Sequence, residues 1–400
     1  MTSLSALRCL SLVPLLLLVQ EPDAPVGPAL LLEAPGGELE RRSLDGLELA
    51  SLRDSGAALL RFEGLPGEPP TAPEVDLARV ELLDGGAVQG RLLGGEGDLI
   101  ELRLVGGSTL RLALEEVGAL RLDGRRPRGW TEAVVPAEAG DRLYRRSGPG
   151  LDRIDGTLAE LLPEGVSMDT DLGTKTFPWA EVAALFIEPL EEEPLRPEGE
   201  SVVVDLIDGS RLRLGFQRLS ATGLDARTPA GQPLRLAPAA VAEILVEGSG
   251  LSFLSELEPL EAEATAPFGD DLGMVWPVRR DRCTTGGPLA AGGRRFTRGL
   301  GVHAPSRVVY GLGGAWSALR AEVAVDDSVL PLPARGSVRF RVLADGEARW
   351  ESEVLEAGEG PVRMPEVDLE GVETLVLEVE SADELFVGDR ANWLRPVLRR

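Results

Sequence analysis

The sequence predicts an all-β protein in which tandem small β repeats precede a larger β-sandwich at the C-terminus. The C-terminal part is a succession of short apolar or alternating runs, such as 319–325, 337–343 and 374–379, separated by turn residues. Earlier in the chain, an apolar residue followed by Asp-Gly recurs at intervals. No C-terminal run has the length and 3.6-residue period of a helix, so strands joined by turns are expected there.

The N-terminal segment predicts export. Arg8 precedes an apolar run at 9–19, which has the length of a signal-peptide core and is too short to span a bilayer. We assign residues 1–29 to a signal peptide and leader, and we expect a secreted, periplasmic or cell-envelope protein with no membrane insertion after cleavage. Removal of this segment leaves Cys283 alone, so we expect no intramolecular disulfide and a buried thiol.

Composition limits the partners. The 400 residues include 66 acidic and 41 basic side chains, a formal net charge of −25. Such a charge repels nucleic acid and anionic membrane surfaces, so neither is expected as a partner. All basic residues except Lys175 are arginine, and with the abundance of Gly and Pro this indicates compositional bias rather than selection for phosphate binding. The length calls for two or more domains.

Repeated signals divide the first part of the chain. Apolar-Asp-Gly, a tight hairpin signal because glycine tolerates positive φ, begins blocks at 44–46, 83–85, 154–156 and 207–209. The last three blocks also end alike, about thirty residues later, with the apolar runs 117–122, 182–187 and 241–246. Each block therefore predicts a hairpin, a further strand, a short helical turn and a final strand. That order is typical of a small SH3-like or Sm-like barrel, or of one blade in a continuous β array.

These signals give the domain boundaries. Joins rich in Pro, Gly and Glu occur at 64–70, 124–140 and 191–200. The first block lacks the final run, and we expect its strands to complete a neighbouring repeat. The predicted divisions are a partial β repeat at 30–64, β repeats at 74–124, 150–190 and 201–248, and a C-terminal module at 250–400.

The C-terminal module resembles a known family. The blocks that carry the resemblance are 298–304, 308–310, 324–327, 336–342, 344–346 and 388–393, preceded by 254–257 and 273–276. In this order they resemble the NPCBM carbohydrate-binding module, which is similar to the galactose-binding-like jelly rolls. The resemblance implies a β-sandwich jelly roll that binds a poly- or oligosaccharide. Similar modules often follow strand repeats in secreted bacterial proteins.

The closing motif departs from the family pattern. The module often ends in Asp-His-Ala-Asp-Trp, whereas this chain has Asp389-Arg390-Ala391-Asn392-Trp393. Arg390 and Asn392 thus replace two residues of the motif, and any ligand contact that those residues make in relatives is in question here.

The single histidine restricts the chemistry. His303 cannot form a multi-histidine zinc site, and any Ser-His-Asp triad would have to include it. We expect its ring to fix a loop at a strand start rather than to act in catalysis. The chain also lacks a Gly-x-Ser-x-Gly elbow, a phosphate loop and a dinucleotide fingerprint.

Carbohydrate binding needs an aromatic platform and planar hydrogen-bonding groups. The available tryptophans are Trp276, Trp316, Trp350 and Trp393, each of which could instead pack in a core. For Trp393 we favour the core. The candidate carbohydrate-binding residues are Trp316, Trp350, Asp389, Arg390, Asn392 and Trp393, with Asn392 expected at a partly exposed position.

Acidic residues leave two further possibilities open. Asp326 and Asp327 could cap a strand, which we favour, or supply oxygen ligands to a structural calcium with Asp389. No other cofactor is expected. The leading hypothesis is an exported, non-catalytic protein that binds carbohydrate through its C-terminal module. The alternatives are a glycoside-active enzyme whose catalytic carboxylates lie in the groove between repeats and module, and a cell-envelope protein whose module binds another protein.

Overall fold

The computed structural model describes residues 27–65, 77–191, 193–263, 275–333, 335–383 and 387–400. The predicted signal peptide lies almost entirely outside these residues. Within them the chain forms antiparallel strands and short 3₁₀ turns without an α-helix, which confirms the all-β prediction. No helix in the described ranges is long and apolar enough to cross a membrane.

Three segments share one arrangement of five antiparallel strands, in which the fifth strand returns after a 3₁₀ turn to pair with the first. The first unit comprises β5 (Leu77–Leu82), β6 (Ala87–Glu96), β7 (Leu99–Arg103), η2 (Val105–Gly107), β8 (Thr109–Ala113), η3 (Leu114–Glu116) and β9 (Val117–Arg121), and η4 (Asp123–Arg125) follows it. The second comprises β10 (Asp141–Ser147), β11 (Gly150–Leu162), β12 (Gly165–Thr170), β13 (Gly173–Pro178), η5 (Trp179–Glu181) and β14 (Val182–Phe186). The third comprises β15 (Ser201–Leu206), β16 (Arg211–Ser220), β17 (Gly223–Arg227), β18 (Pro233–Leu236), η6 (Pro238–Ala240) and β19 (Val241–Val246).

The Asp-Gly signals mark turns at three of the four places. Asp84-Gly85 joins β5 to β6 and Asp208-Gly209 joins β15 to β16, with φ of 85° at both glycines. Asp45-Gly46 turns between β2 (Leu39–Ser43) and β3 (Glu48–Leu49), with φ of 71° at Gly46. Glycine reaches these left-handed angles without the steric cost that a Cβ imposes.

Asp155-Gly156 does not form the predicted hairpin. It lies inside β11, and the hairpin between β10 and β11 is made by residues 147–150. A Cβ at Gly156 would lie 2.2 Å from the carbonyl oxygen of Asp169 on β12, so the position needs glycine for close strand approach rather than for a turn.

The first block folds as β1 (Ala29–Glu33), β2, β3, η1 (Arg53–Ser55) and β4 (Leu59–Glu63). It pairs with the third unit, far along the chain, because β4 lies beside β19 and β3 beside β16. The first and second units join where β9 pairs with β14. One continuous apolar core joins the three units and the first block. We call the described residues of 27–249 the repeat array.

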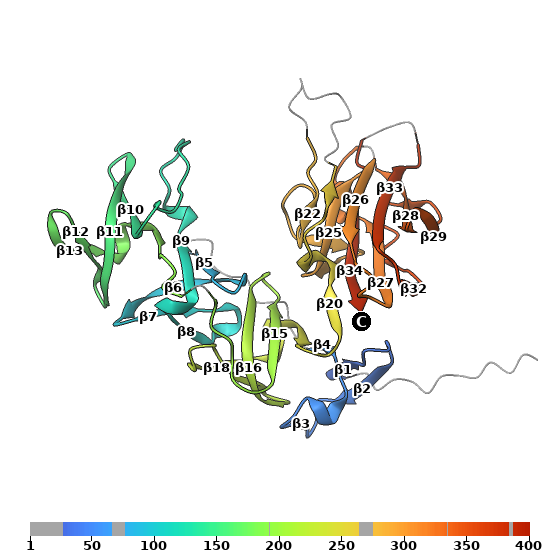
Figure 1. Cartoon of the computed structure of the whole chain (residues 1–400), viewed down its shortest axis with the longest axis horizontal. Helices are drawn as coiled ribbons and strands as arrows, with labels where there is room; N and C mark the ends of the chain where they lie inside the picture. The colour runs from blue at the N-terminus through green and yellow to red at the C-terminus, as the bar shows by residue number, and fades with distance from the viewer. Residues whose placement is uncertain (1–26, 66–76, 192, 264–274, 334, 384–386) are drawn as a thin grey trace, which may run out of the picture.

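The module, residues 250–400, is a β-sandwich of two antiparallel sheets (Figure 1). The seven-stranded sheet contains β20 (Leu251–Phe253), β22 (Arg279–Arg280), β25 (Gly299–His303), β27 (Ala318–Val325), β31 (Val362–Arg363), β32 (Val367–Asp368) and β34 (Arg390–Arg399). The six-stranded sheet contains β21 (Glu261–Ala262), β26 (Ser306–Gly311), β28 (Ser337–Ala344), β29 (Glu347–Glu351), β30 (Leu355–Glu356) and β33 (Thr374–Ser381). The described residues of the module also include the 3₁₀ turns η7 (Leu254–Glu256) and η9 (Asp327–Val329).

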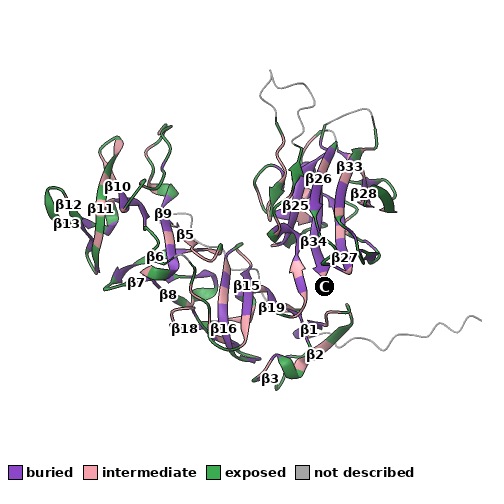
Figure 2. Ribbon diagram, in the orientation of Figure 1, coloured by how far each residue is buried: buried purple, intermediate pink, exposed green. Residues whose placement is uncertain are grey.

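Alternation along the strands builds the sandwich core. On β28, buried Val338, Phe340 and Val342 alternate with half-buried residues, as expected when one sheet face meets the core. Figure 2 shows buried stretches, in purple, along the central strands β26, β33 and β34 of the sandwich. Trp393 of β34 meets Phe340 across the two sheets, edge to face, with ring centroids 5.0 Å apart. This packing confirms the predicted β-sandwich.

A small hairpin covers the outer face of the seven-stranded sheet. It consists of β23 (Leu289–Ala291) and β24 (Arg294–Phe296), which pack with Cys283 over Ala324 and Leu394. Cys283 is a free, buried thiol, as predicted.

The module is docked on the repeat array through an apolar cluster. Ala58, Leu59, Val203 and Leu245 of the array pack with residues of the module. The module contributes Leu251, Phe253 and Val397. Because these side chains come from both parts, the two are joined by packing as well as by the chain.

Three module arginines reinforce this interface. Arg298 pairs with Asp205, Arg395 pairs with Glu243, and Arg320 lies 2.7 Å from Glu33. The Arg298 side chain is fully buried, and the other two are no more than 13% exposed. Removing one partner of a buried ion pair is strongly destabilising, so loss of any of these carboxylates should weaken the docking of the module.

Candidate functional site

Three side chains gather where β25 ends and β34 begins. His303 and Arg390 are register partners at those strand ends. Trp276 precedes β22, which pairs with β25, and its indole stacks on the His303 ring with centroids 5.2 Å apart and planes 13° apart. The guanidinium carbon of Arg390 lies 5.5 Å from the indole centroid. We call these three residues the Trp276 cluster.

Only two members of the cluster can meet a ligand. Trp276 and Arg390 are partly exposed, whereas His303 is 2% exposed. The Arg390 Nη1 donates to the carbonyl oxygen and to Oγ of Ser328, both at 3.2 Å, which fixes the guanidinium beside the indole. The arrangement presents apolar ring surface next to N–H donors, and these are the groups that sugar C–H faces and hydroxyls require.

The imidazole of His303 supports the indole from below. Its Nδ1 lies 2.8 Å from the carbonyl oxygen of Ala304, and since a carbonyl only accepts, Nδ1 carries the proton. Burial, together with the nearby positive charge of Arg390, lowers the pKa of the ring. A neutral imidazole can therefore stack on Trp276 without adding a second cation beside Arg390.

Asn392 is fully buried, contrary to the partly exposed position predicted from the sequence. Its Nδ2 donates to Asp326 Oδ2 at 2.6 Å, and the same oxygen accepts from the backbone N–H of Ala290 at 3.1 Å. Asn392 thus helps to fasten the β23–β24 hairpin to the sheet. Its amide faces Asp326 rather than solvent.

Asp389 is also buried, at 0% exposure. Its Oδ1 accepts from the backbone N–H of Ser337 at 3.1 Å, which ties the start of β34 to the start of β28. Burial raises the pKa of Asp389 to about 6. This carboxyl therefore holds the loop before β34 in place.

The other candidate tryptophans are dispersed. Trp393 is fully buried in the sandwich core, where the sequence favoured it. Trp316 is 8% exposed, and the Arg400 guanidinium lies 5.0 Å from its ring centroid. Trp350 lies on β29, half-buried against the edge of the core. Of the six candidate residues, only Arg390 belongs to the Trp276 cluster.

Asp326 and Asp327 are already occupied by N–H donors. Asp326 Oδ1 caps η9 through the N–H of Ser328 at 3.0 Å, in addition to its bonds from Asn392 and Ala290. Asp327 accepts from the N–H groups of residues 292 and 293, at 3.0 and 2.8 Å. The described residues contain no group of three His, Cys, Asp or Glu side chains placed to hold a metal. Asp326 thus caps the 3₁₀ turn η9, and Asp327 holds the turn between β23 and β24.

Sequence reasoning named Trp276 as a platform but did not select it. Trp276 and His303 are far apart in the sequence, and the pairing of β22 with β25 brings them together. A short strand of two residues leaves almost no periodic signal.

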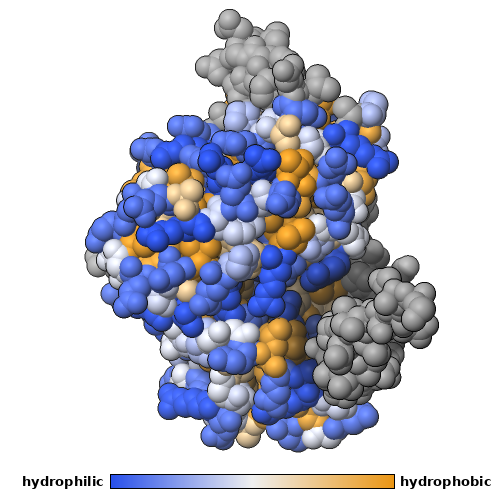
Figure 3. Space-filling view, turned by 90° about the vertical axis from the view of Figure 1, so that its right-hand side faces the viewer, coloured by the Kyte–Doolittle hydropathy of each residue, from blue (hydrophilic) through white to orange (hydrophobic). Residues whose placement is uncertain are grey.

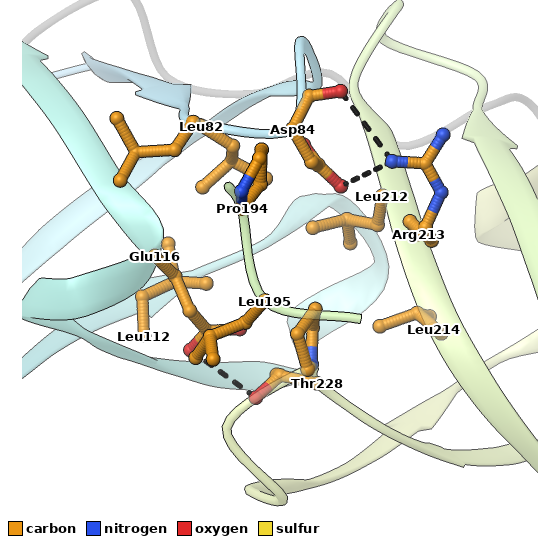
Figure 4. Close-up of a pocket in the computed structure, with 12 residues that line it drawn as sticks. Leu82, Asp84, Leu112, Glu116, Pro194, Leu195, Leu212, Arg213, Leu214 and Thr228 are labelled. Atoms are coloured by element: carbon orange, nitrogen blue, oxygen red, sulfur yellow. Dashed lines mark hydrogen bonds and ion pairs between the residues drawn. The ribbon is translucent and has the colours of Figure 1, made fainter. Parts of the chain in front are cut away.

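A small apolar pocket lies elsewhere, between the first and third units of the array (Figure 4). It is covered by Pro194 and Leu195 and flanked by the Thr228–Glu116 hydrogen bond and the Arg213–Asp84 pair. Its volume of about 20 Å³ holds roughly one water, so it is a packing feature of the array and not a ligand site.

Known proteins share parts of this chain. A protein of Renibacterium salmoninarum named for endo-alpha-N-acetylgalactosaminidase activity is 34% identical over 88 residues, which is 20% of this chain and 6% of the relative. Alpha-1,3-galactosidase B of Akkermansia muciniphila is 30% identical over 120 residues, which is 29% of this chain and 15% of the relative. The chain therefore spans only a small part of these curated relatives.

Solved structures with some likeness include CBM51 from Clostridium perfringens GH95 in complex with methyl-galactose. It has a TM-score of 0.32 and 22% identity, and the match covers 37% of this chain and 99% of that one. The tandem CBM51 modules of Sp3GH98, a family 98 glycoside hydrolase from Streptococcus pneumoniae, have a TM-score of 0.33 and 14% identity. That match covers 80% of this chain and 87% of the other.

The family comparison covers the module alone. The model of the NPCBM/NEW2 domain matches from Gly250 to Arg399, the span of the β-sandwich and of its entry strand β20. The predicted resemblance is thereby confirmed. Residues 250–399 of this chain form an NPCBM/NEW2 domain, a region of the carbohydrate-binding-module type.

Proposed function

We propose that this protein is exported and binds carbohydrate, without cleaving it, through the Trp276 cluster of its NPCBM/NEW2 domain. The observation that carries the proposal is a partly exposed indole, held flat on a buried imidazole and flanked by an anchored guanidinium, within this domain. The indole supplies apolar contact to a sugar ring, and Arg390 supplies hydrogen-bond donors to its hydroxyls.

The repeat array serves, on this proposal, as the scaffold that carries the module. We infer that its five-stranded units are SH3-like or Sm-like, because each pairs its first strand with its fifth after a 3₁₀ turn. The buried arginine pairs hold the module in one orientation on this scaffold. The Trp276 cluster shares no residue with the apolar cluster and arginine pairs of the docked interface.

A glycoside-active enzyme is the alternative from another class. Glycosidases use two carboxyl groups, about 5–5.5 Å apart in retaining enzymes and about 6.5–9.5 Å apart in inverting enzymes. The acids between array and module are largely committed to arginines, as Asp205 is to Arg298 and Arg211. A cell-envelope protein whose module binds another protein is the third possibility.

A glycan array with the full chain, combined with assays for released sugar on the same glycans, distinguishes these functions. We expect a defined set of glycans to be bound and none to be cleaved. Release of sugar from any of these glycans would indicate a glycoside-active enzyme instead of a non-catalytic binding protein. Capture of a protein partner with no glycan response would favour the cell-envelope role.

A further inference from the structure

A long groove separates the repeat array from the module, beside the docked interface. It consists of three cavities of about 600, 430 and 490 Å³. The first two share Arg79 and Arg211, and the last two share Arg295 and Phe296, so the three form one continuous depression. Each segment falls within the range of about 300–1,000 Å³ that is usual for small-ligand sites.

The groove is basic although the protein is acidic. Nine arginines and six carboxylates line the three cavities, whereas the chain carries 41 basic and 66 acidic side chains in all. Charge lining a concave surface focuses the field that a ligand meets, so this region attracts anions against the background of the whole molecule. Much of the remaining surface is hydrophilic, with small separate apolar patches, as Figure 3 shows for one face.

Three of the nine arginines have no carboxylate partner among the described residues. They are Arg79 on β5, Arg282 just after β22 and Arg295 on β24, and all three line the central cavity. Their side chains are partly or fully exposed. Arg282 reaches across from the module, since its Nη2 lies 3.5 Å from where a Cβ of residue 209 on the array would be. Both walls of the groove thus present a guanidinium without an internal counterion.

The other charges of the groove are largely neutralised within it. Arg211, for example, pairs with Asp205 at 2.9 Å and with Asp281 at 2.7 Å. Asp208 is the one lining carboxylate with no ion pair in the described part of the chain, and its Oδ1 accepts from the N–H of Ser210. The central cavity therefore has three uncompensated cations and one uncompensated anion.

We propose that this groove binds a segment of acidic polysaccharide, with carboxylate or sulfate groups on Arg79, Arg282 and Arg295. Guanidinium groups match planar carboxylates and sulfates with paired N–H donors. The open, elongated shape suits a chain that enters at one end and leaves at the other. The site is separate from the Trp276 cluster, none of whose residues lines it.

A polysaccharide fits better than a nucleic acid or an acidic protein. Nucleic acid carries a charge about every 1.7 Å along its duplex axis, and phosphates beyond the groove would meet the acidic surface. Acidic sugars place their charges one ring apart, so a few charges can lie in the groove while neutral parts contact its rim. This choice of ligand class rests on the proposed carbohydrate-binding function, whereas the anion site itself does not.

The test compares two triple variants of the full chain. Arg79→Gln, Arg282→Gln and Arg295→Gln together remove the groove cations. The control variant combines Arg91→Gln, Arg146→Gln and Arg363→Gln, which change the net charge by the same amount. These three arginines are exposed, lie outside the groove and have no ion pair within the described ranges. Thermal unfolding of both variants checks that the fold is retained.

Calorimetric titration with oligogalacturonate and with a sulfated galactan oligosaccharide measures binding, and the two probes separate carboxylate from sulfate ligands. We expect binding of at least one probe by the natural protein and by the control variant, and affinity at least about tenfold weaker in the groove variant. Raising the salt concentration should weaken binding of the natural protein.

Three outcomes would overturn the proposal: no binding of either acidic probe, equal affinity in the groove variant, or equally tight binding of oligodeoxythymidylate or polyglutamate. Trp276→Ala separates this site from the proposed function. That variant should keep its affinity for the acidic probe whatever happens to neutral glycans. Loss of the acidic probe in Trp276→Ala would instead place the acidic ligand at the Trp276 cluster.

Discussion

Burial decides which polar side chains of the closing motif can reach a ligand. Side chains along a strand alternate between the two faces of the sheet, so Arg390 and Asn392 lie on the same face. The β23–β24 hairpin covers Asn392 and leaves Arg390 uncovered. Sequence alone placed Trp393 correctly in the core, because a large aromatic in an alternating strand is most often buried. It could not show that a hairpin a hundred residues earlier would cover Asn392.

Asn392→Ala should lower stability, because Asn392 is buried and not partly exposed as the sequence led us to expect. The substitution removes a 2.6 Å hydrogen bond to the carboxylate of Asp326, and a buried hydrogen bond to a charged group contributes about 1.5–3 kcal/mol. Denaturant unfolding measures the change. Gln217→Ala, which removes an exposed amide, is the control and should stay within about 0.5 kcal/mol. Equal effects in both variants would contradict the role of Asn392 as a fastener.

Asp389 should make the stability of the module pH-dependent. Its pKa is about 6 in the fold, whereas an unperturbed aspartate has a pKa of 3.8. Below about pH 4 the carboxyl is protonated in both the folded and the unfolded protein, so its burial carries no charge penalty. Above about pH 6 it is ionised in both states, and the folded protein bears the full penalty of the buried charge. The free energy of unfolding therefore falls as the pH rises from about 4 to about 6. At about 1.4 kcal/mol per pKa unit, the difference amounts to about 1–3 kcal/mol.

The comparison with Asp389→Asn isolates this effect from other titrations. The variant cannot ionise, so its stability relative to the natural protein should rise between pH 4 and pH 6. Urea unfolding at several pH values measures this difference. A difference that stays constant from pH 4 to pH 7 would show that the Asp389 carboxyl is not buried as a charge.

At the level of elements, the chain is organised by turns and by close strand approaches. Asp-Gly pairs located three turns correctly because each of these turns places a residue at positive φ, which glycine adopts readily. The fourth pair failed because glycine is also needed where two backbones approach, as at Gly156, and a dipeptide does not distinguish these uses. The pairing of β4 with β19 was beyond prediction, since strand partners distant in sequence leave no local signal.

Gly156→Ala should destabilise the second unit. The added Cβ would lie 2.2 Å from the carbonyl oxygen of Asp169, so β11 and β12 must separate, at a cost of about 1–3 kcal/mol typical of overpacking. Gly150→Ala on the same strand is the control, since the nearest atom to a Cβ there is 3.4 Å away, an ordinary van der Waals contact. Hydrogen exchange of the β11 and β12 amides reports the local effect. Unchanged protection in both variants would show that the strands can absorb the methyl group.

For the whole molecule, the central feature is the docking of the module on the repeat array. The sequence predicted separate units, because joins and repeats are visible in composition. It gave no sign that Arg298, within a family motif, would reach Asp205 of the third unit. Such pairs depend on tertiary placement, and in a chain with 41 basic residues no single arginine is conspicuous.

Asp205→Asn together with Glu243→Gln should loosen the module from the array. The substitutions leave Arg298 and Arg395 buried without their anionic partners, and breaking a buried pair in this way costs about 3–5 kcal/mol. X-ray scattering should show a larger radius of gyration, and thermal unfolding a lower midpoint. The control, Asp152→Asn with Glu101→Gln, removes two exposed pairs and should have little effect. An unaltered shape and stability would mean that the apolar cluster alone holds the module.

The most direct test of the account measures neutral-glycan affinity of the full chain with Trp276→Ala and Trp350→Ala, using the strongest binder from the glycan array. Both substitutions remove a partly exposed tryptophan of the module, but only Trp276 stacks on His303 and lies beside Arg390. If the Trp276 cluster is the carbohydrate site, Trp276→Ala should weaken binding at least about tenfold, equivalent to about 1.4 kcal/mol, while Trp350→Ala binds as the natural protein does. Undiminished affinity in a folded Trp276→Ala variant, or loss of affinity only in Trp350→Ala, would contradict the account.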